Sequence, residues 1–217
     1  MIPSGAKSNV PLRLVQPEEA ARPRRWGDLE IIEGLRSGQS AAAVALCEAV
    51  EPAISATLSQ VLGRSDRDHD DLCQTALMRV VDSVVNSRFA GRCTLRTWAN
   101  VIASRLALDE LRRRRRERTV LDSDSGDETS QVAAPASGSP ERLVSDQQQL
   151  SALRDALAQL RPARAQAVML FDILGHDLEE VARLTNVSVA AAQSSVVRGR
   201  QELRRLLRKT REGADNV

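Results

Sequence analysis

Apolar residues return at helical spacing along most of the chain, and the stretch DRDHDDLCQTALMRVVDSVV, residues 66–85, shows this most clearly. Its apolar side chains recur every three or four positions, which places them on one face of a helix. They are Leu72, Ala76, Leu77, Val80, Val81 and Val84. The opposite face is acidic and polar, so we expect it to be exposed. No segment alternates as a half-buried strand does, and the pattern predicts an all-α fold.

Two predicted helices precede this one. Asp28 is expected to cap a helix in DLEIIEGLRSG, which ends at Gly38. A second helix is predicted from about Ser40 to Leu62, with Pro52 as a kink or break. No apolar stretch is expected to reach the roughly 20 residues that a membrane span needs, and the N-terminus lacks the apolar core of a secretory signal. We therefore expect a cytoplasmic protein.

A longer predicted helix follows the segment RFAGRCTLRTW, in which Gly91 interrupts the helical pattern. Trp98 shares a helical face with Ile102 and Leu108, so its ring is interpreted as part of the core. Phe89 lies in the loop, and a ring beside arginines is how proteins hold unstacked bases.

The other faces of this helix carry the polar residues. Arg105 and Asp109 fall near the middle of the apolar arc at i and i+4 and are interpreted as an ion pair. The residues predicted to face outward are Arg96, Asn100, Ala103, Ala107 and Arg114.

The C-terminal part of the chain has the order of a helix-turn-helix. A short helix from Leu178 to Leu184, a turn from Thr185 to Ser188 and a longer helix from near Val189 are predicted. The long helix would bury Ala192, Val196, Gly199, Leu203 and Leu206, and expose Ala191, Ser194, Ser195 and Arg198. Any three-helix bundle can imitate this spacing, so the pattern alone leaves DNA reading open.

Composition divides the chain into two small helical domains, 28–118 and 148–210. Between them, residues 119–147 are rich in Ser, Asp, Gly and Pro without hydrophobic period, and are predicted to form a flexible acidic linker. Residues 1–27, with four prolines, are expected to be a disordered arm, and residues 211–217 a tail. We expect the two domains to move semi-independently.

Charge is segregated although the net charge is only +2. Residues 83–118 contain ten arginines against three acidic residues, including five consecutive arginines at 112–116. One or two cations at a helix C-terminus favour the helix dipole, but ten exceed that need, and charge blocks of alternating sign suggest surfaces with different partners. Residues 119–147 reverse the sign, with one arginine against six acidic residues.

No catalytic or metal-binding constellation is recognised. Cys47, Cys73 and Cys93 have no CxxC spacing and are expected to be reduced structural thiols. His69 and His176 lack nearby nucleophiles or ligand spacing. The sequence predicts a protein that is not an enzyme and needs no cofactor or metal.

Taken together, these motifs resemble a bacterial sigma factor of the extracytoplasmic function class, group 4 of the sigma-70 family, over roughly residues 28–210. DDLCQTALMRVV is similar to the region 2 helix that docks on the polymerase clamp. FAGRCTLRTWANVIASRLALDELRRRRR is similar to the segment that melts the promoter and reads its minus-ten element. The stretch from LAQLRPARAQAV through SSVVRGRQEL resembles region 4, which reads the minus-thirty-five element.

The resemblance implies a promoter-specificity subunit for a stress- or signal-responsive regulon, with core RNA polymerase (the beta-prime clamp and beta flap), promoter DNA and an anti-sigma factor as partners. That factor could hold the protein at the membrane. The implied polymerase-binding residues are Asp70, Asp71, Gln74, Thr75, Met78 and Asp82. The implied minus-ten residues are Arg88, Phe89, Arg92, Thr94, Arg96, Asn100, Arg112 and Arg113. The implied minus-thirty-five residues are Ser188, Ala191, Gln193, Ser194, Ser195, Arg198 and Arg200.

The sequence departs from the family pattern at several positions. Thr75 stands where a glutamate is common, and Arg105 where an asparagine is. In the helix that corresponds to the family's DNA-recognition helix, Ala190–Ser195 replaces a run that has two more cations. An alternative is therefore a sigma-like protein that binds polymerase or an anti-sigma factor without reading DNA. An unrelated helix-turn-helix repressor would explain neither the linker nor the docking face.

Overall fold

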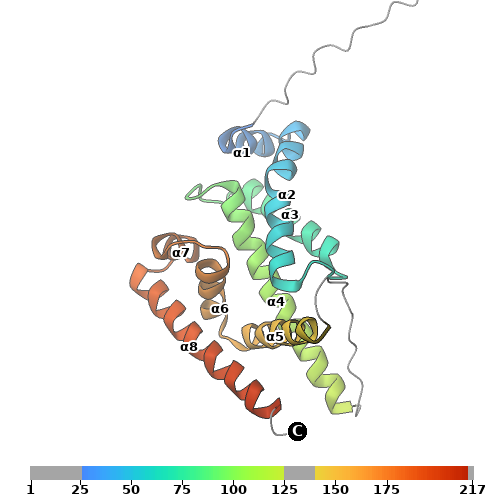
Figure 1. Cartoon of the computed structure of the whole chain (residues 1–217). Helices are drawn as coiled ribbons and strands as arrows, with labels where there is room; N and C mark the ends of the chain where they lie inside the picture. Colours follow the sequence, from blue (N-terminus) through green and yellow to red (C-terminus); the bar gives the residue numbers. More distant parts are fainter. Residues whose placement is uncertain (1–25, 125–139, 215–217) are drawn as a thin grey trace, which may run out of the picture.

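The computed structural model describes residues 26–124 and 140–214, and all regular structure in these residues is helical (Figure 1). This confirms the predicted all-α fold. The first domain contains α1 (Asp28–Arg36), α2 (Ser40–Leu62), α3 (His69–Val85) and α4 (Leu95–Asp124). The second contains α5 (Pro140–Gln159), α6 (Pro162–Val168), a π-helical turn η1 (Met169–Ile173), α7 (Leu178–Thr185) and α8 (Val189–Ala214).

Helix α1 begins at Asp28, so the prediction that Asp28 is its N-cap was wrong. Gly27 holds that position, and its backbone N–H donates to the Glu30 carboxylate over 3.1 Å. The Asp28 carboxylate accepts instead from the backbone N–H of Leu95, at 2.8 Å. It thus satisfies a free donor at the start of α4, far away in sequence.

Helix α2 runs from Ser40 to Leu62 as predicted, with Pro52 inside it. Contrary to the sequence-based expectation, its length and apolarity would suffice to cross a membrane. The structure gives these residues another environment, because α2 packs against α1, α3 and α4. Leu46, Val50, Ile54 and Leu58 are fully buried there. The apolar character of α2 is that of a core helix.

The packing faces predicted from periodicity are confirmed where burial tests them. Ala76, Val80 and Val84 of α3 are fully buried, and Leu72, Leu77 and Val81 pack against the same core. In α8, Ala192, Val196, Gly199 and Leu203 are buried. A Cβ on Gly199 would lie 2.6 Å from Cγ2 of Val168, so glycine allows α8 to approach α6 closely.

Helix α4 is the central element of the fold (Figure 1). It packs against α2 and α3 on one side, and against α5, α6 and η1 on the other. It continues to Asp124, and α5 begins at Pro140, so helix extends into both ends of the predicted linker 119–147. Residues 125–139, the middle of that linker, lie outside the described residues, as do the predicted arm up to residue 25 and residues 215–217.

The two domains share their hydrophobic cores. Val101 of α4, 0% exposed, belongs to the cluster built mainly by the second domain, with Leu170 and Val181. Leu157 of α5 and Met169 belong in turn to the cluster of the first domain. The expectation of two semi-independent domains therefore does not describe this conformation.

Candidate nucleic-acid and polymerase interfaces

The outward face of α3 is polar and acidic around one apolar side chain. Asp70, Asp71, Gln74 and Asp82 are partly or fully exposed, and Thr75 is half-buried. Met78 is 71% exposed. The structure therefore brings the six predicted polymerase-binding residues together on α3, opposite its buried stripe. Such a surface can pair with cations and insert one flexible apolar side chain into a partner.

The loop between α3 and α4 is anchored by its aromatic residue. Phe89 is 6% exposed, and its ring centroid lies 5.9 Å from that of Trp98. The Trp98 indole N–H donates to Ser83 Oγ over 2.8 Å. The ring of Phe89 therefore fills the core and offers no face to a base, which argues against the base-stacking role predicted for it. The core role predicted for Trp98 agrees with its packing.

The predicted polar residues at the start of α4 divide into two groups. Arg88, Arg92, Thr94 and Arg96 are exposed. Thr94 Oγ1 accepts from the backbone N–H of Thr97 at 3.1 Å, so this side chain caps α4. Asn100 turns inward, where its Oδ1 accepts from the Thr57 hydroxyl at 3.2 Å. The structure thus contradicts the predicted outward face at Asn100.

Three further features of this helix differ from the prediction. Ala103 and Ala107, predicted to face outward, are fully buried. Arg105 and Asp109 are both exposed, and Asp109 pairs at 3.0 Å with Arg112 rather than with Arg105. The sequence pattern therefore assigned some buried residues to the exposed face of α4. The pattern accounts for one buried face, whereas α4 is buried on two sides.

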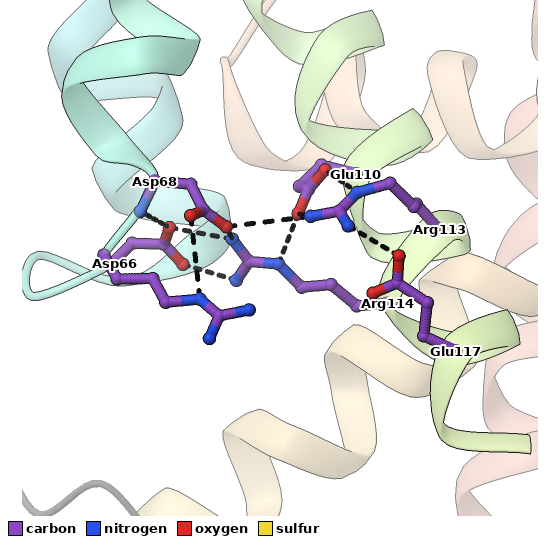
Figure 2. Close-up of polar contacts among 7 residues, drawn as sticks. Asp66, Asp68, Glu110, Arg113, Arg114 and Glu117 are labelled. Carbon is purple, nitrogen blue, oxygen red and sulfur yellow. Dashed lines mark hydrogen bonds and ion pairs between the residues drawn. The ribbon is translucent and has the colours of Figure 1, made fainter. Parts of the chain in front are cut away.

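Two arginines of the run, Arg113 and Arg114, are held by acidic side chains (Figure 2). The Arg114 guanidinium contacts Asp66 at 2.5 and 2.8 Å, Asp68 at 2.9 Å and Glu110 at 2.5 Å. Arg113 donates twice to Glu110, at 2.6 and 2.8 Å, and once to Glu117 at 2.6 Å. Together, Asp66, Asp68, Glu110, Arg113, Arg114 and Glu117 form what we call the acid–arginine network.

This network joins the α2–α3 loop to the C-terminal half of α4. The side chains of Asp66 and Glu110 are only 5% and 8% exposed, so their charges require close partners. The hydrogen bond from Arg114 lowers the pKa of Asp66, and the hydrogen bond from Arg113 lowers the pKa of Glu110. Both carboxyls are therefore ionised at neutral pH and neutralise arginines that the sequence alone assigns to DNA.

The remaining arginines of the run differ in whether an acidic side chain already pairs with them. Arg112 is half-buried and paired with Asp109, and Arg118 pairs with Asp155 of α5. Arg115 is half-buried and Arg116 exposed, and within the described part of the chain neither has an ion-pair partner. These two line a groove of about 490 Å³ between α4 and α5, together with Arg112, Thr119, Val120 and Ala158.

The second domain contains the predicted helix-turn-helix. Asp177 caps α7 by accepting from the backbone N–H of Glu180 at 2.7 Å. Asn186 in the turn has left-handed backbone angles, φ 57° and ψ 47°, which end α7 and redirect the chain into α8. The Ser188 hydroxyl accepts from the Ala191 N–H at 3.2 Å and caps α8. Capping thus explains why both helices start where the sequence predicts.

The predicted reading residues lie along the first turns of α8. Ser188, Ala191, Gln193 and Arg198 are exposed, whereas Ser194 and Ser195 are half-buried. Arg200 forms an ion pair with Asp172 and lies 5.0 Å over the Phe171 ring, so its charge is already partnered. Arg198 is then the exposed cation of this predicted set.

The surroundings of the cysteines and histidines indicate structural roles for these side chains. Cys47, Cys73 and Cys93 are free thiols, as predicted, and burial raises the pKa of Cys73 and of Cys93. Within the described residues, no three His, Cys, Asp or Glu side chains are grouped to hold a metal ion. His69 Nε2 lies 3.0 Å from Ser55 Oγ, and His176 Nδ1 lies 2.8 Å from Glu180.

Sequence reasoning misses the residues that connect distant segments. In the sequence, Asp66 and Asp68 are part of a generally acidic segment, although in the structure they hold the arginine run. Ser104 and Gln166 form a buried hydrogen bond of 2.9 Å between the domains, and the sequence analysis assigned no role to either residue. The one available signal is a polar residue on an apolar face, since such a residue needs a partner when buried.

Comparison with known proteins identifies relatives of both domains. The Sigma-70 region 2 family profile matches residues 46–117, and the Sigma-70, region 4 profile matches residues 150–203. The ECF RNA polymerase sigma factor SigE of Mycolicibacterium smegmatis is 33% identical over 153 residues, 70% of this chain and 56% of SigE. The RNA polymerase sigma factor CarQ of Myxococcus xanthus is 33% identical over 138 residues, 64% of this chain and 74% of CarQ. The match thus spans little more than half of SigE.

Two solved structures are also similar to the chain. CnrH in complex with the cytosolic domain of CnrY aligns with 84% of this chain and 97% of that one, at 21% identity and a TM-score of 0.49. The sigma factor RpoE in complex with the anti-sigma factor NepR, from Bartonella quintana, aligns with 83% and 93%, at 23% identity and a TM-score of 0.40.

The acid–arginine network predicts a specific loss of stability in acid. The pKa of Glu110 is lowered in the folded state, so its stabilisation is complete above the unfolded-state pKa of about 4.3 and is lost as pH falls through the folded value. Glu110→Gln should therefore cost about 2 kcal/mol at pH 7 and flatten the decline of stability below about pH 4. Urea unfolding between pH 7 and pH 2 measures both effects.

Glu117→Gln is the matched control, because Glu117 is half exposed and contacts only Arg113 of the network. It should change stability by well under about 1 kcal/mol. Equal effects of the two substitutions would contradict the structural role assigned to Glu110.

Proposed function

The chain belongs to the extracytoplasmic function class of RNA polymerase sigma factors in the sigma-70 family, and from this membership we propose that it is a promoter-specificity subunit. In this role it binds core RNA polymerase, recognises a minus-ten and a minus-thirty-five element, and starts transcription of a stress- or signal-responsive regulon. One observation carries the proposal: a single chain combines the exposed polar face of α3 with a helix-turn-helix, in the segments that match regions 2 and 4.

The α3 face is the proposed docking site for the beta-prime clamp of core polymerase. Its acidic residues favour a basic partner surface, and Met78 supplies an apolar contact at the centre. The second domain is proposed to contact the beta flap. Docking through both domains holds them at the separation that the two promoter elements require.

Minus-ten recognition is proposed for the start of α4 and the loop before it. Arg88, Arg92 and Arg96 are exposed there, and Arg116 adds an exposed cation further along α4. These side chains neutralise phosphates and thereby position the strand, while base choice comes from the residues around Thr94. The structure favours Arg96 and Arg116 over Arg113 as phosphate ligands, because Glu110 and Glu117 already hold Arg113.

Sigma factors of this family are transcription initiation factors, and we propose that this chain has no catalytic activity of its own. RNA synthesis is then the chemistry of the polymerase. The factor acts in the cytoplasm, at the nucleoid, with no cofactor. CnrH was solved in complex with the cytosolic domain of CnrY, and RpoE in complex with the anti-sigma factor NepR. We accordingly propose an anti-sigma factor as a partner of this chain, with sequestration at the membrane as one means of control.

A second candidate function is binding of polymerase or an anti-sigma factor without DNA reading. The start of α8 favours it, because small residues occupy Ala190–Ala192 and Arg200 is paired with Asp172. Transcription from promoters with and without an intact minus-thirty-five element separates this candidate from a full promoter-specificity subunit. Only the promoter-specificity subunit should lose activity when the element is disrupted.

Run-off transcription with purified core polymerase, on fragments of the protein's own genome, tests the proposed function. The chain should direct initiation at defined start sites. Asp71→Lys with Gln74→Lys should weaken core binding by about 2 kcal/mol, because the change opposes charge on a complementary surface. Folding should be unchanged, since neither side chain is buried.

Glu33→Lys, an exposed acid-to-base change on α1, is the control and should leave core affinity unaltered. Unchanged affinity of the double variant would remove α3 from the interface. Absence of initiation at any fragment, with core binding intact, would favour the second candidate.

The salt dependence of promoter opening distinguishes free arginines from those held internally. Arg96→Ala and Arg116→Ala should each reduce the slope of log affinity against log salt by about one, as expected for one lost phosphate contact. Arg114→Ala should leave the slope unchanged and lower thermal stability, because Arg114 is engaged by Asp66, Asp68 and Glu110. A reduced slope for Arg114→Ala, with unchanged slopes for Arg96→Ala and Arg116→Ala, would contradict the assignment of phosphate contacts to the free arginines.

A further inference from the structure

The groove between α4 and α5 is lined along α4 by three arginines. Its volume of about 490 Å³ is within the range of small-molecule sites. The arginines are Arg112, Arg115 and Arg116, and their spacing of three and four residues places them on one face of the helix. We call this space the arginine groove.

The positive charge of the arginine groove is only partly balanced within the described part of the chain. Arg112 forms one ion pair, with Asp109 at 3.0 Å. Arg115 and Arg116 have no ion-pair partner among the described residues, although Arg115 is half-buried. Cations three or four residues apart on a helix repel one another. An anion in the groove would relieve this repulsion.

Arg112 also has a hydrogen-bond donor that is not satisfied. Its side chain is 18% exposed, and its Nη2 is buried without a hydrogen-bond partner among the described residues. A buried N–H without an acceptor is unfavourable. A guanidinium presents its donors in a planar fork that matches two oxygens of a phosphate. A phosphate bound beside Arg112 would therefore supply the acceptor that Nη2 lacks.

The neighbouring arginines of α4 are already paired with acidic side chains. Arg113 and Arg114 belong to the acid–arginine network, and Arg118 pairs with Asp155 of α5. Their side chains are not among those that line the arginine groove. The unbalanced charge in this half of α4 is therefore concentrated in the groove.

The wall formed by α5 limits the size of the ligand. Ala158 of α5 lines the arginine groove and is 8% exposed, and α5 packs against α4. A DNA duplex, whose major groove alone is about 12 Å wide, is too bulky for this space. A chain of two or three phosphates is small enough, and each phosphate offers several charged oxygens to arginine.

We propose that the arginine groove binds a short polyphosphate chain, supplied either by inorganic polyphosphate or by a nucleoside polyphosphate. Arg115 and Arg116 neutralise the chain, and Arg112 donates to its oxygens. Arg116 is also a phosphate ligand in the promoter complex proposed above. The polyphosphate and promoter DNA therefore exclude each other at this side chain, a consequence that rests on the proposed function.

Two neighbouring residues provide a test that leaves the arginines intact. Val120 lines the arginine groove and Leu121 does not, and their side chains are 66% and 62% exposed. Val120→Glu places a carboxylate four residues after Arg116, where it pairs with this arginine and repels phosphate. Leu121→Glu is the matched control, because it adds the same charge outside the groove. Both variants should fold, since both side chains are exposed.

Isothermal titration calorimetry of the full chain, at low salt and without magnesium, measures binding of ATP, inorganic tripolyphosphate and adenosine. We expect both phosphate probes to bind once per chain and adenosine not to bind. Val120→Glu, Arg115→Ala and Arg116→Ala should each weaken binding of the phosphate probes about tenfold, because each removes one charge-assisted contact. Leu121→Glu and Arg118→Ala should weaken it less than about threefold.

The two phosphate probes distinguish the sources of the chain. Tighter binding of ATP would support a nucleoside polyphosphate as the ligand, and equal or tighter binding of tripolyphosphate would support the inorganic chain. Absence of binding by both probes would overturn the proposal. So would equal weakening by Val120→Glu and Leu121→Glu, with circular dichroism confirming folded chains, because the probes would then respond only to net charge.

Competition with DNA is measured with a fluorescent 30-base-pair duplex at constant ionic strength. Saturating tripolyphosphate should lower the duplex affinity of the wild type and of Leu121→Glu at least about threefold, and that of Val120→Glu less. An equal loss in all three chains would contradict competition at Arg116. Calorimetry involves neither DNA nor polymerase, so its outcome is independent of the proposed function. A chain that binds ATP but never initiates in run-off transcription would contradict the proposed function alone.

Discussion

The structure depends on the burial of one helix, α4, from two sides. Toward the first domain it carries Ala99, Ala103 and Ala107, all fully buried, and small side chains let α2 and α3 approach closely. Toward the second domain it carries Val101 and Ser104, also fully buried. A helix that supplies two cores cannot expose a broad reading face at the same time. This competition limits how much of α4 is available for the DNA contacts proposed for it.

Ion pairs within the protein determine which arginines of α4 remain available to a partner. Ten arginines in residues 83–118 suggest a continuous cationic surface, but Asp66, Glu110 and Glu117 neutralise much of the charge of the run. The network stabilises the α2–α3 connection, and so it fixes α3, the proposed docking helix, relative to α4. The cations that remain for the proposed DNA contacts are fewer, such as Arg96 at the start of α4 and Arg116 in its C-terminal half.

The sequence was sufficient for elements whose determinants are local. The period of α3 predicted its buried stripe, and the order of helix, turn and helix predicted α7 and α8 to within a residue or two. It failed where a partner lies far away in the chain. Asp28 caps α4 instead of α1, Asn100 faces Thr57, and Phe89 is buried against Trp98. Periodicity describes one face of one helix, whereas α4 has two buried faces that only the tertiary arrangement defines.

The packing of both domains against α4 is tested most directly by the distance between the two domains in solution. Spin labels introduced at Val44 of α2 and Gln201 of α8, both exposed, would report it by pulsed electron paramagnetic resonance. Shared burial of α4 predicts one narrow distance distribution for the free chain. A broad distribution in the free chain would contradict the central claim that both domains bury α4.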